Sequence, residues 1–242
     1  MFRSEQKIAL LPEGRRVYAV GDIHGCAAQL EQLTNAIVRD GENGAEIQSI
    51  VYLGDYVDRG PDSKGVIEGL LCPPPGFQMH FLRGNHDQFL LDFLEDPNLF
   101  RLWKNYGGQE TLISYGVLPP RFDDESAFAE ARDQLAAVLP PSHLQFLRSL
   151  RLSIEIGDYF FVHAGVRPGV PLESQAAEDL LSIRDEFLMS SENFGRVVVH
   201  GHSPTPSPVR RRNRIGVDTG AYATGHLTAA VLEGADCRFL HT

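Results

Sequence analysis

The sequence predicts an α/β fold in which two packed mixed β-sheets are flanked by helices in four layers, and three observations support this class. A strand-loop-helix pattern occurs three times in succession near the start of the chain, which implies parallel strands with helices on the faces of the sheet. β-Prone runs return in the last third of the chain and supply a second set of strands. The 242 residues are 43% hydrophobic, which is enough apolar sequence to bury between two sheets.

The three repeated units share the same internal order. Each begins with a short β-prone run and ends in a loop where glycine adjoins a polar residue, as a strand that enters a turn does. After the first loop, Leu30, Leu33 and Ile37 fall on one helical face. We therefore expect strands at 17–20, 50–53 and 79–82 and helices at 27–38, 66–71 and 88–94.

The middle of the chain differs from both ends. Residues 97–150 are mostly helical in pattern, and the proline pairs 119–120 and 140–141 divide them into shorter pieces. We expect this segment to form a helical cap-like layer within a single domain that spans residues 1–242. After it, the sequence predicts one amphipathic helix at 176–189 and strands at 159–162, 197–200, 215–217, 227–232 and 237–240.

Composition and charge argue against several classes of partner. The 32 acidic side chains outnumber the 22 basic ones, so the long-range field disfavours nonspecific binding to nucleic acid or to an anionic membrane surface. No run of 18 apolar residues is present, and the apolar run at 8–11 is too short for the core of a signal peptide. The three cysteines show no CxxC spacing and cannot all pair with one another. We expect a cytoplasmic protein with no membrane or nucleic-acid partner.

Potential metal ligands stand beside glycines at the ends of the predicted strands. In open α/β sheets, ligands bind in the loops beyond the carboxyl ends of the strands. These loops carry Asp, Asn and His, a mixture of donors suited to Mn, Fe, Zn or Ni rather than Ca, and the lack of cysteine ligands argues against a structural zinc site. The blocks are Gly-Asp-Ile-His-Gly at 21–25, Gly-Asp-Tyr-Val-Asp-Arg-Gly at 54–60, Gly-Asn-His-Asp at 84–87, His-Ala-Gly at 163–165 and Gly-His-Ser at 201–203.

These five blocks, in this order, resemble the signature of the calcineurin-like metallophosphoesterases. The block at 54–60 is similar to that of the phosphoprotein phosphatase branch, which includes bacterial and phage serine/threonine phosphatases and the symmetrical diadenosine tetraphosphate hydrolases. A further match, Val-Asp-Thr-Gly-Ala at 217–221, extends the resemblance to the last strands. One such block alone is weak, whereas five ordered blocks form a specific pattern.

The resemblance implies a centre of two divalent metal ions, with Mn expected and Fe, Zn or Ni as alternatives. A carboxylate is needed as the bridge, because two cations about 3.5 to 4 Å apart repel each other strongly. A bridging water, its pKa lowered by both cations, would become the hydroxide that attacks phosphorus directly. Position by position, the implied ligands are Asp22 and His24 for the first metal, Asp55 as the bridge, and Asn85, His163 and His202 for the second metal.

The resemblance also implies residues that act on the substrate. His86 would protonate the leaving oxygen, and Asp58 would favour its charged form by charge and hydrogen bonding. Arg59 and Arg184 would hold phosphate oxygens with their planar guanidinium groups. Arg83 is a third candidate for that role.

The chain departs from the family pattern in a few places. Ser182 stands where relatives often have Trp, two residues before Arg184, so a solvated helix arginine is the alternative reading there. Asp87 replaces the commoner Glu, and its shorter side chain can alter the contacts around the ligands. His200 and His202 point the same way on an extended chain, and the Gly-His-Ser context favours His202 as the ligand and His200 as a packed histidine.

The leading hypothesis is a metal-dependent phosphoric-monoester hydrolase of the serine/threonine protein phosphatase type, acting on a phosphorylated protein or a small phosphoester. The alternative is a symmetrical diadenosine tetraphosphate hydrolase, which would share the same core. A hypothesis of a different class is a noncatalytic phosphate-binding or scaffold module. The cluster from Arg210 to Arg214 is either a contact for an extended anionic substrate or a solvated loop, and Tyr106 is interpreted as structural.

Overall fold

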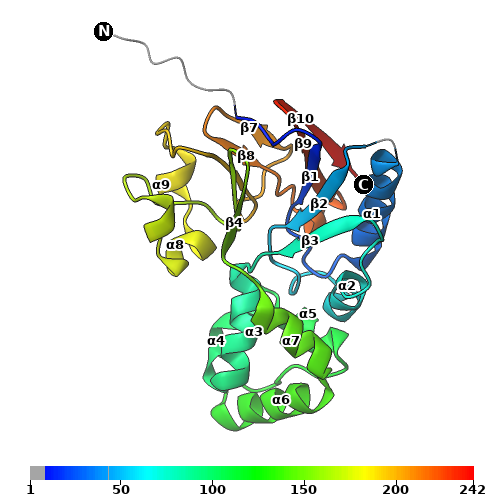
Figure 1. The fold of residues 1–242 in the computed structure, drawn as a ribbon. Helices are drawn as coiled ribbons and strands as arrows, with labels where there is room; N and C mark the ends of the chain where they lie inside the picture. The colour runs from blue at the N-terminus through cyan, green and yellow to red at the C-terminus, as the bar shows by residue number, and fades with distance from the viewer. Residues whose placement is uncertain (1–8, 43) are drawn as a thin grey trace.

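The computed structural model describes residues 9–42 and 44–242, and the strands of this part of the chain form two five-stranded sheets. Their order is β10-β9-β1-β2-β3 in the first sheet and β4-β5-β6-β8-β7 in the second (Figure 1). Both sheets are mixed and flanked by helices, so the predicted fold class is confirmed. The strands are β1 (Arg15–Val20), β2 (Ile47–Tyr52), β3 (Phe77–Phe81), β4 (Ser153–Ile156), β5 (Tyr159–Val162), β6 (Val197–His200), β7 (Val209–Arg210), β8 (Arg214–Gly216), β9 (Thr228–Glu233) and β10 (Asp236–His241).

Parallel strands lie next to one another in each sheet. β1, β2 and β3 are parallel, while β9 runs antiparallel to β1. β5, β6 and β8 are parallel, and β4 and β7 are antiparallel edge strands. The sequence pattern does not predict β4 or β7, because neither contains the run of consecutive apolar residues that marks β5 and β6. The carboxyl ends of parallel strands share one edge, so the loops after β1, β2, β5 and β6 can converge.

The apolar core is arranged in layers that follow the alternation of side chains along the strands. In β1, Val17 and Ala19 face the second sheet and belong to a cluster that includes Phe161 of β5. Tyr18 and Val20 point the other way, into a cluster with the helices. This period of two buries both faces of the first sheet.

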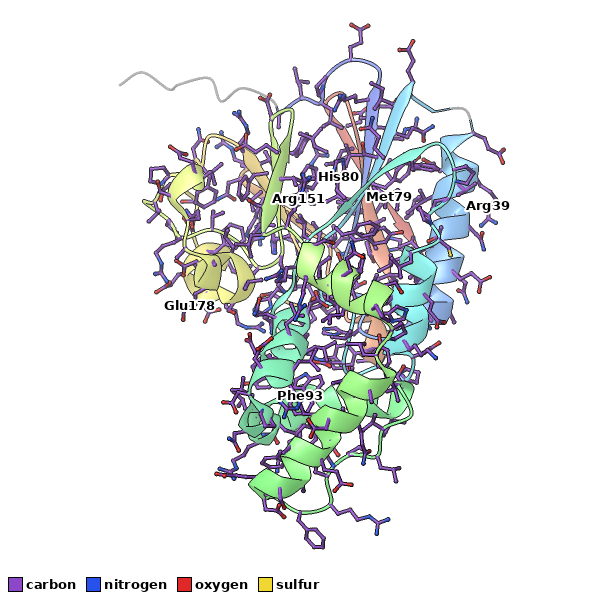
Figure 2. All side chains as sticks on the ribbon, turned by 60° about the horizontal axis from the view of Figure 1, so that its bottom comes forward. Arg39, Met79, His80, Phe93, Arg151 and Glu178 are labelled. Atoms are coloured by element: carbon purple, nitrogen blue, oxygen red, sulfur yellow. The ribbon has the colours of Figure 1, made fainter. Side chains whose placement is uncertain are left out.

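Helices cover the outer faces of the sheets and form a lobe at the bottom of Figure 1. α1 (Ala27–Gly41) and α2 (Ser63–Leu70) pack on the first sheet, and α8 (Ala177–Ser182) and α9 (Asp185–Leu188) pack on the second. Phe93 lies buried among the helices of the lobe (Figure 2). The lobe consists of α3 (Asn85–Glu95), α4 (Phe100–Trp103), α5 (Gly108–Ser114), α6 (Glu125–Val138), α7 (Pro141–Ser149) and the 3₁₀ turns Pro97–Leu99 and Lys104–Tyr106. The remaining elements are the 3₁₀ turn Leu172–Ser174 and α10 (Ala221–Thr224).

The single helix predicted at 176–189 is wrong, because the chain breaks between α8 and α9. The carbonyl oxygen of Leu180 accepts a hydrogen bond from Ala164 N (2.9 Å), so it does not bond to the amide of Arg184 as a continuous helix would require. Ile183 is extended instead, and Arg184 begins the next helical turn. Among the described residues, no helix is both long enough and apolar enough to cross a membrane.

Candidate metal centre

The predicted blocks from both sheets meet at the carboxyl ends of the strands. In the first sheet, the amides of Ile23 and His24 donate to the carbonyl of Asp55, at 3.1 and 2.8 Å. The amide of His202 donates to both carboxylate oxygens of Asp22 at 3.1 Å, which ties the second sheet to the first. Gly201 has to be glycine here because a Cβ atom would overlap Asp22 Oδ1. The loops are therefore held together by contacts between residues up to 180 positions apart.

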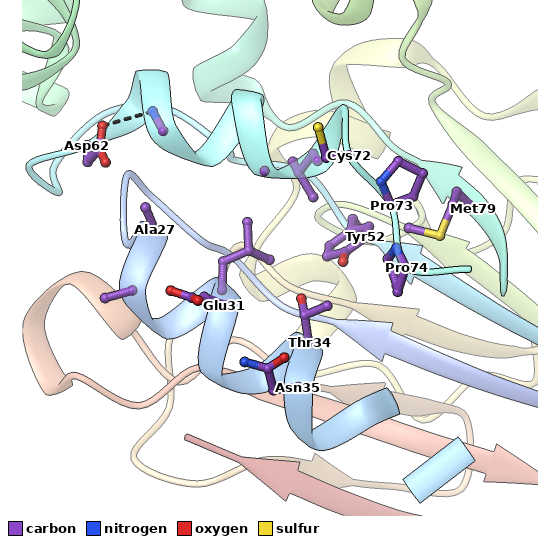
Figure 3. Close-up of a pocket in the computed structure, with 15 residues that line it drawn as sticks. Ala27, Glu31, Thr34, Asn35, Tyr52, Asp62, Cys72, Pro73, Pro74 and Met79 are labelled. Carbon is purple, nitrogen blue, oxygen red and sulfur yellow. Dashed lines mark hydrogen bonds between the residues drawn. The ribbon is translucent and has the colours of Figure 1, made fainter. Parts of the chain in front are cut away.

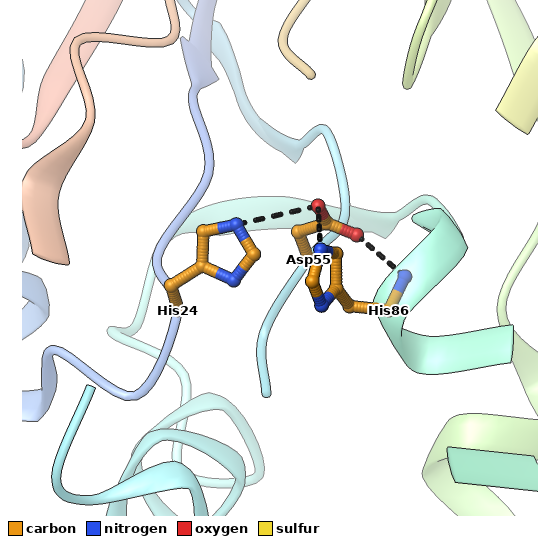
Figure 4. Close-up of side chains that lie close together, drawn as sticks. All are labelled: His24, Asp55 and His86. Carbon is orange, nitrogen blue, oxygen red and sulfur yellow. Dashed lines mark hydrogen bonds and ion pairs between the residues drawn. The ribbon is translucent and has the colours of Figure 1, made fainter. Parts of the chain in front are cut away.

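Asp55 lies at the middle of this arrangement. Its Oδ2 atom is 3.4 Å from Nε2 of His24, 3.4 Å from Nε2 of His163 and 3.9 Å from Nε2 of His86. Figure 4 shows the rings of His24 and His86 turned toward the Asp55 carboxylate. The donor atoms form two groups, each compact enough to hold a metal ion. We call His24, Asp55 and His86 the first donor group and Asp55, His163 and His202 the second donor group.

Backbone carbonyls orient the histidines of both groups. Nδ1 of His24 donates to Val57 O and Nδ1 of His163 donates to Leu53 O, both at 2.9 Å, so each ring directs Nε2 toward Asp55. This is the outer hydrogen bond that metal-binding histidines usually make. Nε2 of His202 is buried and has no hydrogen-bond partner among the described residues. A buried lone pair without a partner, beside imidazole and carboxylate donors, fits a transition-metal ion.

Two predicted ligands stand beside the donor groups rather than inside them. Oδ1 of Asn85, at the start of α3, is 3.0 Å from Nε2 of His163. Asp22 is oriented by the amide of His202 and lies close to Asp218, a residue to which the sequence pattern assigns no role. The structure thus brings all six predicted ligands together; five of them are buried, Asn85 is partly buried, and Asp22 belongs to neither donor group.

Burial sets the protonation of these side chains. Removal from water raises the pKa of Asp22 and of Asp55, and neighbouring carboxylates raise the pKa of Asp22 further. Burial also lowers the pKa of His24 and His163 far below the ordinary value and that of His202 to about 3. Neutral imidazoles are the form that binds metal, and cations would offset the clustered carboxylate charge.

Backbone strain is concentrated at this centre. In the described part of the chain, every non-glycine residue with a positive φ is one of the predicted site residues. Such conformations cost about 1 to 3 kcal/mol each and persist only where the surroundings impose them, which is common at functional sites. These residues are His24 (φ 46°), Asp55 (54°), Asp58 (72°), Arg59 (68°) and His202 (62°).

The predicted pair of His86 and Asp58 is held by the helical lobe. Asp58 Oδ2 is 2.7 Å from His86 Nδ1 and accepts from Trp103 Nε1 at 2.7 Å, while Oδ1 accepts from Thr111 Oγ1 at 2.6 Å. Burial lowers the pKa of His86, but the carboxylates of Asp55 and Asp58 outweigh it and raise the pKa above its ordinary value. Sequence reasoning missed Trp103 and Thr111, and the fact that Trp103 is the single tryptophan was the one available signal.

Asp87 anchors the loop that presents Asp55. Its carboxylate accepts hydrogen bonds from the amides of Asp55 (2.9 Å), Tyr56 (2.9 Å) and Gly84 (2.8 Å). Burial and the nearby Asp55 raise the pKa of Asp87 to about 7. The shorter side chain noted in the sequence therefore still reaches three backbone donors.

The three predicted arginines have different surroundings. Nη2 of Arg59 is 3.1 Å from Nε2 of His86, and its guanidinium lies 4.7 Å from the ring centre of Tyr222. Arg184, at the break between α8 and α9, reaches Ser203 Oγ at 3.5 Å, beside the second donor group. The structure does not bring Arg83 to the centre. Its guanidinium instead donates to Gln88 Oε1 (2.9 Å) and to the carbonyl of Arg148 (3.2 Å) at the end of α7.

A groove of about 530 Å³ between α1 and α2 is separate from this centre (Figure 3). Apolar and small residues such as Leu30 and Met79 line much of it. The carboxylate of Asp62 at its edge already accepts from Gly65 N (2.8 Å) as the cap of α2. No predicted site residue lines the groove.

Comparisons with known proteins agree with this geometry. The model of the calcineurin-like phosphoesterase family matches residues 15–229. The chain is 23% identical over 233 residues to the bis(5'-nucleosyl)-tetraphosphatase PrpE (asymmetrical) of Geobacillus sp. (strain WCH70), covering 88% of this chain and 89% of that one. The enzyme of the same name from Oceanobacillus iheyensis is 23% identical over 234 residues, with coverage of 88% and 87%.

Solved structures share the fold of this chain. A crystal structure of a protein assigned as a diadenosine tetraphosphatase superimposes with a TM-score of 0.64 at 25% identity, over 93% of each chain. A cold-active protein tyrosine phosphatase shares the fold with a TM-score of 0.60 at 18% identity, over 98% of this chain and 80% of that one. The family model spans most of the chain, and the donor groups lie within its range. The chain therefore belongs to the calcineurin-like phosphoesterase family and is a metal-dependent phosphoesterase.

Proposed function

We propose that this chain hydrolyses dinucleoside tetraphosphates. The observation that carries the proposal is a row of four rings across the centre: Tyr222, His24, His86 and Tyr106. The ring centres are 5.4, 4.6 and 6.2 Å apart in that order. The two tyrosines at the ends are 41% and 42% exposed, so each offers an aromatic surface beside the donor groups on which a nucleobase can stack.

The comparisons support the same substrate class. Curated relatives that match nearly nine tenths of the chain are named bis(5'-nucleosyl)-tetraphosphatases, and a similar solved structure has been assigned a corresponding activity. The relatives are named asymmetrical enzymes, whereas the alternative considered from sequence was the symmetrical hydrolase. We propose asymmetrical cleavage, which would release one nucleoside triphosphate and one nucleoside monophosphate.

The proposed ligands are those that the resemblance implies. We assign Asp55 as the bridge, which its membership of both donor groups supports. Bound divalent cations would supply Lewis-acid activation of water and neutralise charge on the phosphoryl group, with Mn as the expected ion and Fe, Zn or Ni as alternatives. The remaining assignments are Asp22 and His24 for the first ion and Asn85, His163 and His202 for the second.

His86 is proposed as the general acid that protonates the leaving oxygen. Asp58 holds Nδ1 at 2.7 Å, which directs Nε2 toward Asp55 and the substrate side of the centre. Nη2 of Arg59 lies 3.1 Å from Nε2, so the guanidinium competes with a proton for that nitrogen. A substrate phosphate would attract the guanidinium of Arg59, and Nε2 could then carry the proton that the two neighbouring carboxylates favour.

Two arginines are proposed to bind phosphate oxygens from different sides. Arg59 lies beside the first donor group, against His86 and Tyr222. Arg184 lies beside the second, because its charge acts on His202 and its side chain reaches Ser203. We do not retain Arg83 for this role, because its guanidinium binds the carbonyls at the end of α7.

A serine/threonine protein phosphatase remains the second candidate, and the block at 54–60 favours it, because that block resembles the phosphoprotein phosphatase branch. In this reading His86, Asp58 and Arg59 keep the same roles on a phosphoserine substrate. The symmetrical hydrolase uses the same residues on the same dinucleotide and differs only in the bond cleaved.

Initial rates on three substrates separate these candidates. The Mn²⁺-supplied enzyme would be compared on diadenosine tetraphosphate, a phosphoserine peptide and p-nitrophenyl phosphate, with Asp55→Asn as the blank. A higher kcat/KM for the dinucleotide, with ATP and AMP as products, is the expected result. Two ADP would assign the symmetrical reaction, and preference for the peptide would transfer the assignment to the protein phosphatases.

The role of the aromatic row is tested by truncating its ends. Tyr222→Ala and Tyr106→Ala should each lower kcat/KM for diadenosine tetraphosphate by about tenfold, since stacking of one base contributes about 1 to 3 kcal/mol. The rate on p-nitrophenyl phosphate, which has no nucleobase, should fall several-fold less, and any loss in Tyr222→Ala would come from the contact of its ring with Arg59. Phe122→Ala, which removes an exposed ring of the lobe, is the matched control. Equal losses on both substrates would reject stacking.

A further inference from the structure

A basic pocket lies outside the metal centre, between the end of α9 and the turn before β8. Its volume is about 640 Å³, within the range of small-molecule sites, and none of the described residues that line it is acidic. Its polar lining includes Arg211, Arg212, Arg214, Ser190 and Asn213. The whole chain carries a formal charge of −10. The three arginines around this cavity therefore give it a positive charge that is opposite in sign to the net charge of the protein.

Side chains of the described residues do not neutralise the charge of this pocket. Among the ion pairs of residues 9–42 and 44–242, none involves Arg211, Arg212 or Arg214, whereas Arg167 pairs with two carboxylates. Arg214 is only 9% exposed, and its Nη2 donates to Leu188 O at 2.8 Å. Its Nε is buried without a hydrogen-bond partner in the described structure. A buried cation with no counter-ion is costly, and an anion in the pocket would offset that cost.

Hydrogen bonds hold the walls of the pocket in place. Nδ2 of Asn213 donates to the carbonyls of Ser190 (3.0 Å) and Glu192 (2.9 Å), which fixes the chain after α9 against the turn. The amide of Arg211 donates to Arg214 O at 2.8 Å and closes the turn itself. The pocket is therefore formed before any ligand binds, which reduces the entropy that binding would cost.

The pocket and the metal centre lie at opposite ends of the same strand. Arg214 is the first residue of β8, at its amino end. Val217 follows the carboxyl end of β8. Its amide donates a hydrogen bond to the carbonyl of His200, which is two residues before the predicted ligand His202. A ligand held by Arg214 would therefore occupy a site separate from the one that performs hydrolysis.

We propose that this pocket binds a small anion that carries two or more phosphate groups. Planar guanidinium groups bind phosphate oxygens through paired N–H donors, and several such groups around one cavity match an anion with many acceptor oxygens better than a single carboxylate. Because the inference uses residues outside the metal centre, it stands whether or not the enzyme acts on dinucleotides.

Calorimetric titration of inorganic pyrophosphate into the Mn²⁺-loaded enzyme, freed of excess metal, tests the proposal. We expect a binding event in addition to any at the metal centre. Arg211→Ala and Arg212→Ala should each weaken it by about tenfold, as expected for loss of a charge-assisted hydrogen bond. Arg210→Ala is the matched control, because it removes the same charge from a neighbouring exposed residue that lies near Tyr159 and Cys237 instead of lining the pocket.

Three outcomes would overturn the proposal. Absence of the additional event in the unmodified enzyme would leave the metal centre as the only phosphate site. Equal weakening by Arg210→Ala would show that the response follows net charge rather than the pocket. Tighter binding of an oligoglutamate peptide than of pyrophosphate would assign the pocket to an acidic protein segment. Rates on p-nitrophenyl phosphate within twofold of the unmodified enzyme would show that the variants are folded and that the hydrolytic site is intact.

Discussion

The two donor groups share Asp55 and each contains a histidine held by a backbone carbonyl, but they differ in their other histidine, His86 in the first group and His202 in the second. In the first group, His86 is paired with Asp58, and that carboxylate is held in turn by Trp103 and Thr111 of the helical lobe. In the second group, no carboxylate of the described residues accepts a hydrogen bond from the ring of His202, and Nε2 of that ring is buried without a hydrogen-bond partner. The pKa of His86 is raised, whereas the pKa of His202 falls to about 3.

This difference shows how one residue type can serve two kinds of chemistry in one centre. Burial alone favours the neutral ring, which offers a lone pair to a cation. Two nearby carboxylates reverse that effect, and the ring then holds a proton that it can donate. The contrast supports assigning His202 to metal binding and His86 to proton transfer, and each prediction below tests one side of it.

The largest effect is expected at the residue that both groups share. Asp55→Asn should lower kcat/KM by at least about a thousandfold and reduce bound metal from two ions to one or none, because a neutral amide is a poor bridge between two cations. Metal content by plasma mass spectrometry and initial rates would check this. Asp236→Asn, an exposed site on β10, is the matched control, and an Asp55→Asn enzyme with two bound ions would contradict the shared role.

Substituting the proposed acid and, separately, the proposed ligand should distinguish proton transfer at His86 from metal binding at His202. His86→Asn should retain two metal ions yet lose about a hundredfold in rate on a phosphoserine peptide, whose alkoxide leaving group must be protonated, and less than tenfold on p-nitrophenyl phosphate, whose leaving group needs little protonation. His202→Asn should instead lose metal and slow both substrates to a similar extent. If His86→Asn slowed both substrates equally, His86 would act as a ligand in the first donor group and not as the acid.

The sequence predicted much of this centre because its pattern is local. Each of the five blocks lies directly after a β-prone run, so motif and strand could be identified together from neighbouring residues. The parallel order then requires the blocks to converge at one edge of each sheet. The residue-by-residue roles came from the resemblance rather than from geometry, and they stay predictions that the experiments above test.

What the sequence could not predict depends on contacts between distant segments. Trp103 and Thr111 reach Asp58 across 45 and 53 residues, and neither lies in a block or follows a strand. The break before Arg184 arises because Leu180 O bonds to Ala164, a partner that no helical periodicity can reveal. From the sequence, Arg211, Arg212 and Arg214 fit a solvated loop equally well. Only the structure shows that they line a cavity.

The dependence of the first donor group on the lobe can be measured at Thr111. Thr111→Val removes the hydroxyl that donates to Asp58 Oδ1 and accepts from Asp58 N, with little change in shape. A hydrogen bond to a charged group contributes about 1.5 to 3 kcal/mol, so the free energy of unfolding should fall by about 2 kcal/mol. Chemical denaturation would measure this, with Ser142→Ala, which removes an exposed hydroxyl at the start of α7, as the control. Bound metal should stay at two ions, and its loss would place Thr111 with the ligands.

An effect of similar size, seen only as a change with pH, concerns His200, which belongs to neither group although it lies two residues from His202. Burial lowers its pKa to about 4, from an ordinary value of 6.5. Below pH 6.5 the unfolded chain gains a proton at this position that the folded protein does not accept, so folding stability declines as the pH falls from 6.5 toward 4. From pH 7 to pH 5 this one group should cost about 2 kcal/mol.

His200→Gln should remove that contribution while keeping a polar side chain beside the carbonyl of Gly201. Unfolding by urea at pH 7 and pH 5, with metal removed by EDTA from both proteins, isolates it, because the other buried histidines titrate equally in the two chains. The unmodified protein should lose about 2 kcal/mol more than His200→Gln over that interval. Equal losses would mean that His200 accepts a proton in the folded state, and the second sheet would then contain a charged histidine two residues before the proposed ligand.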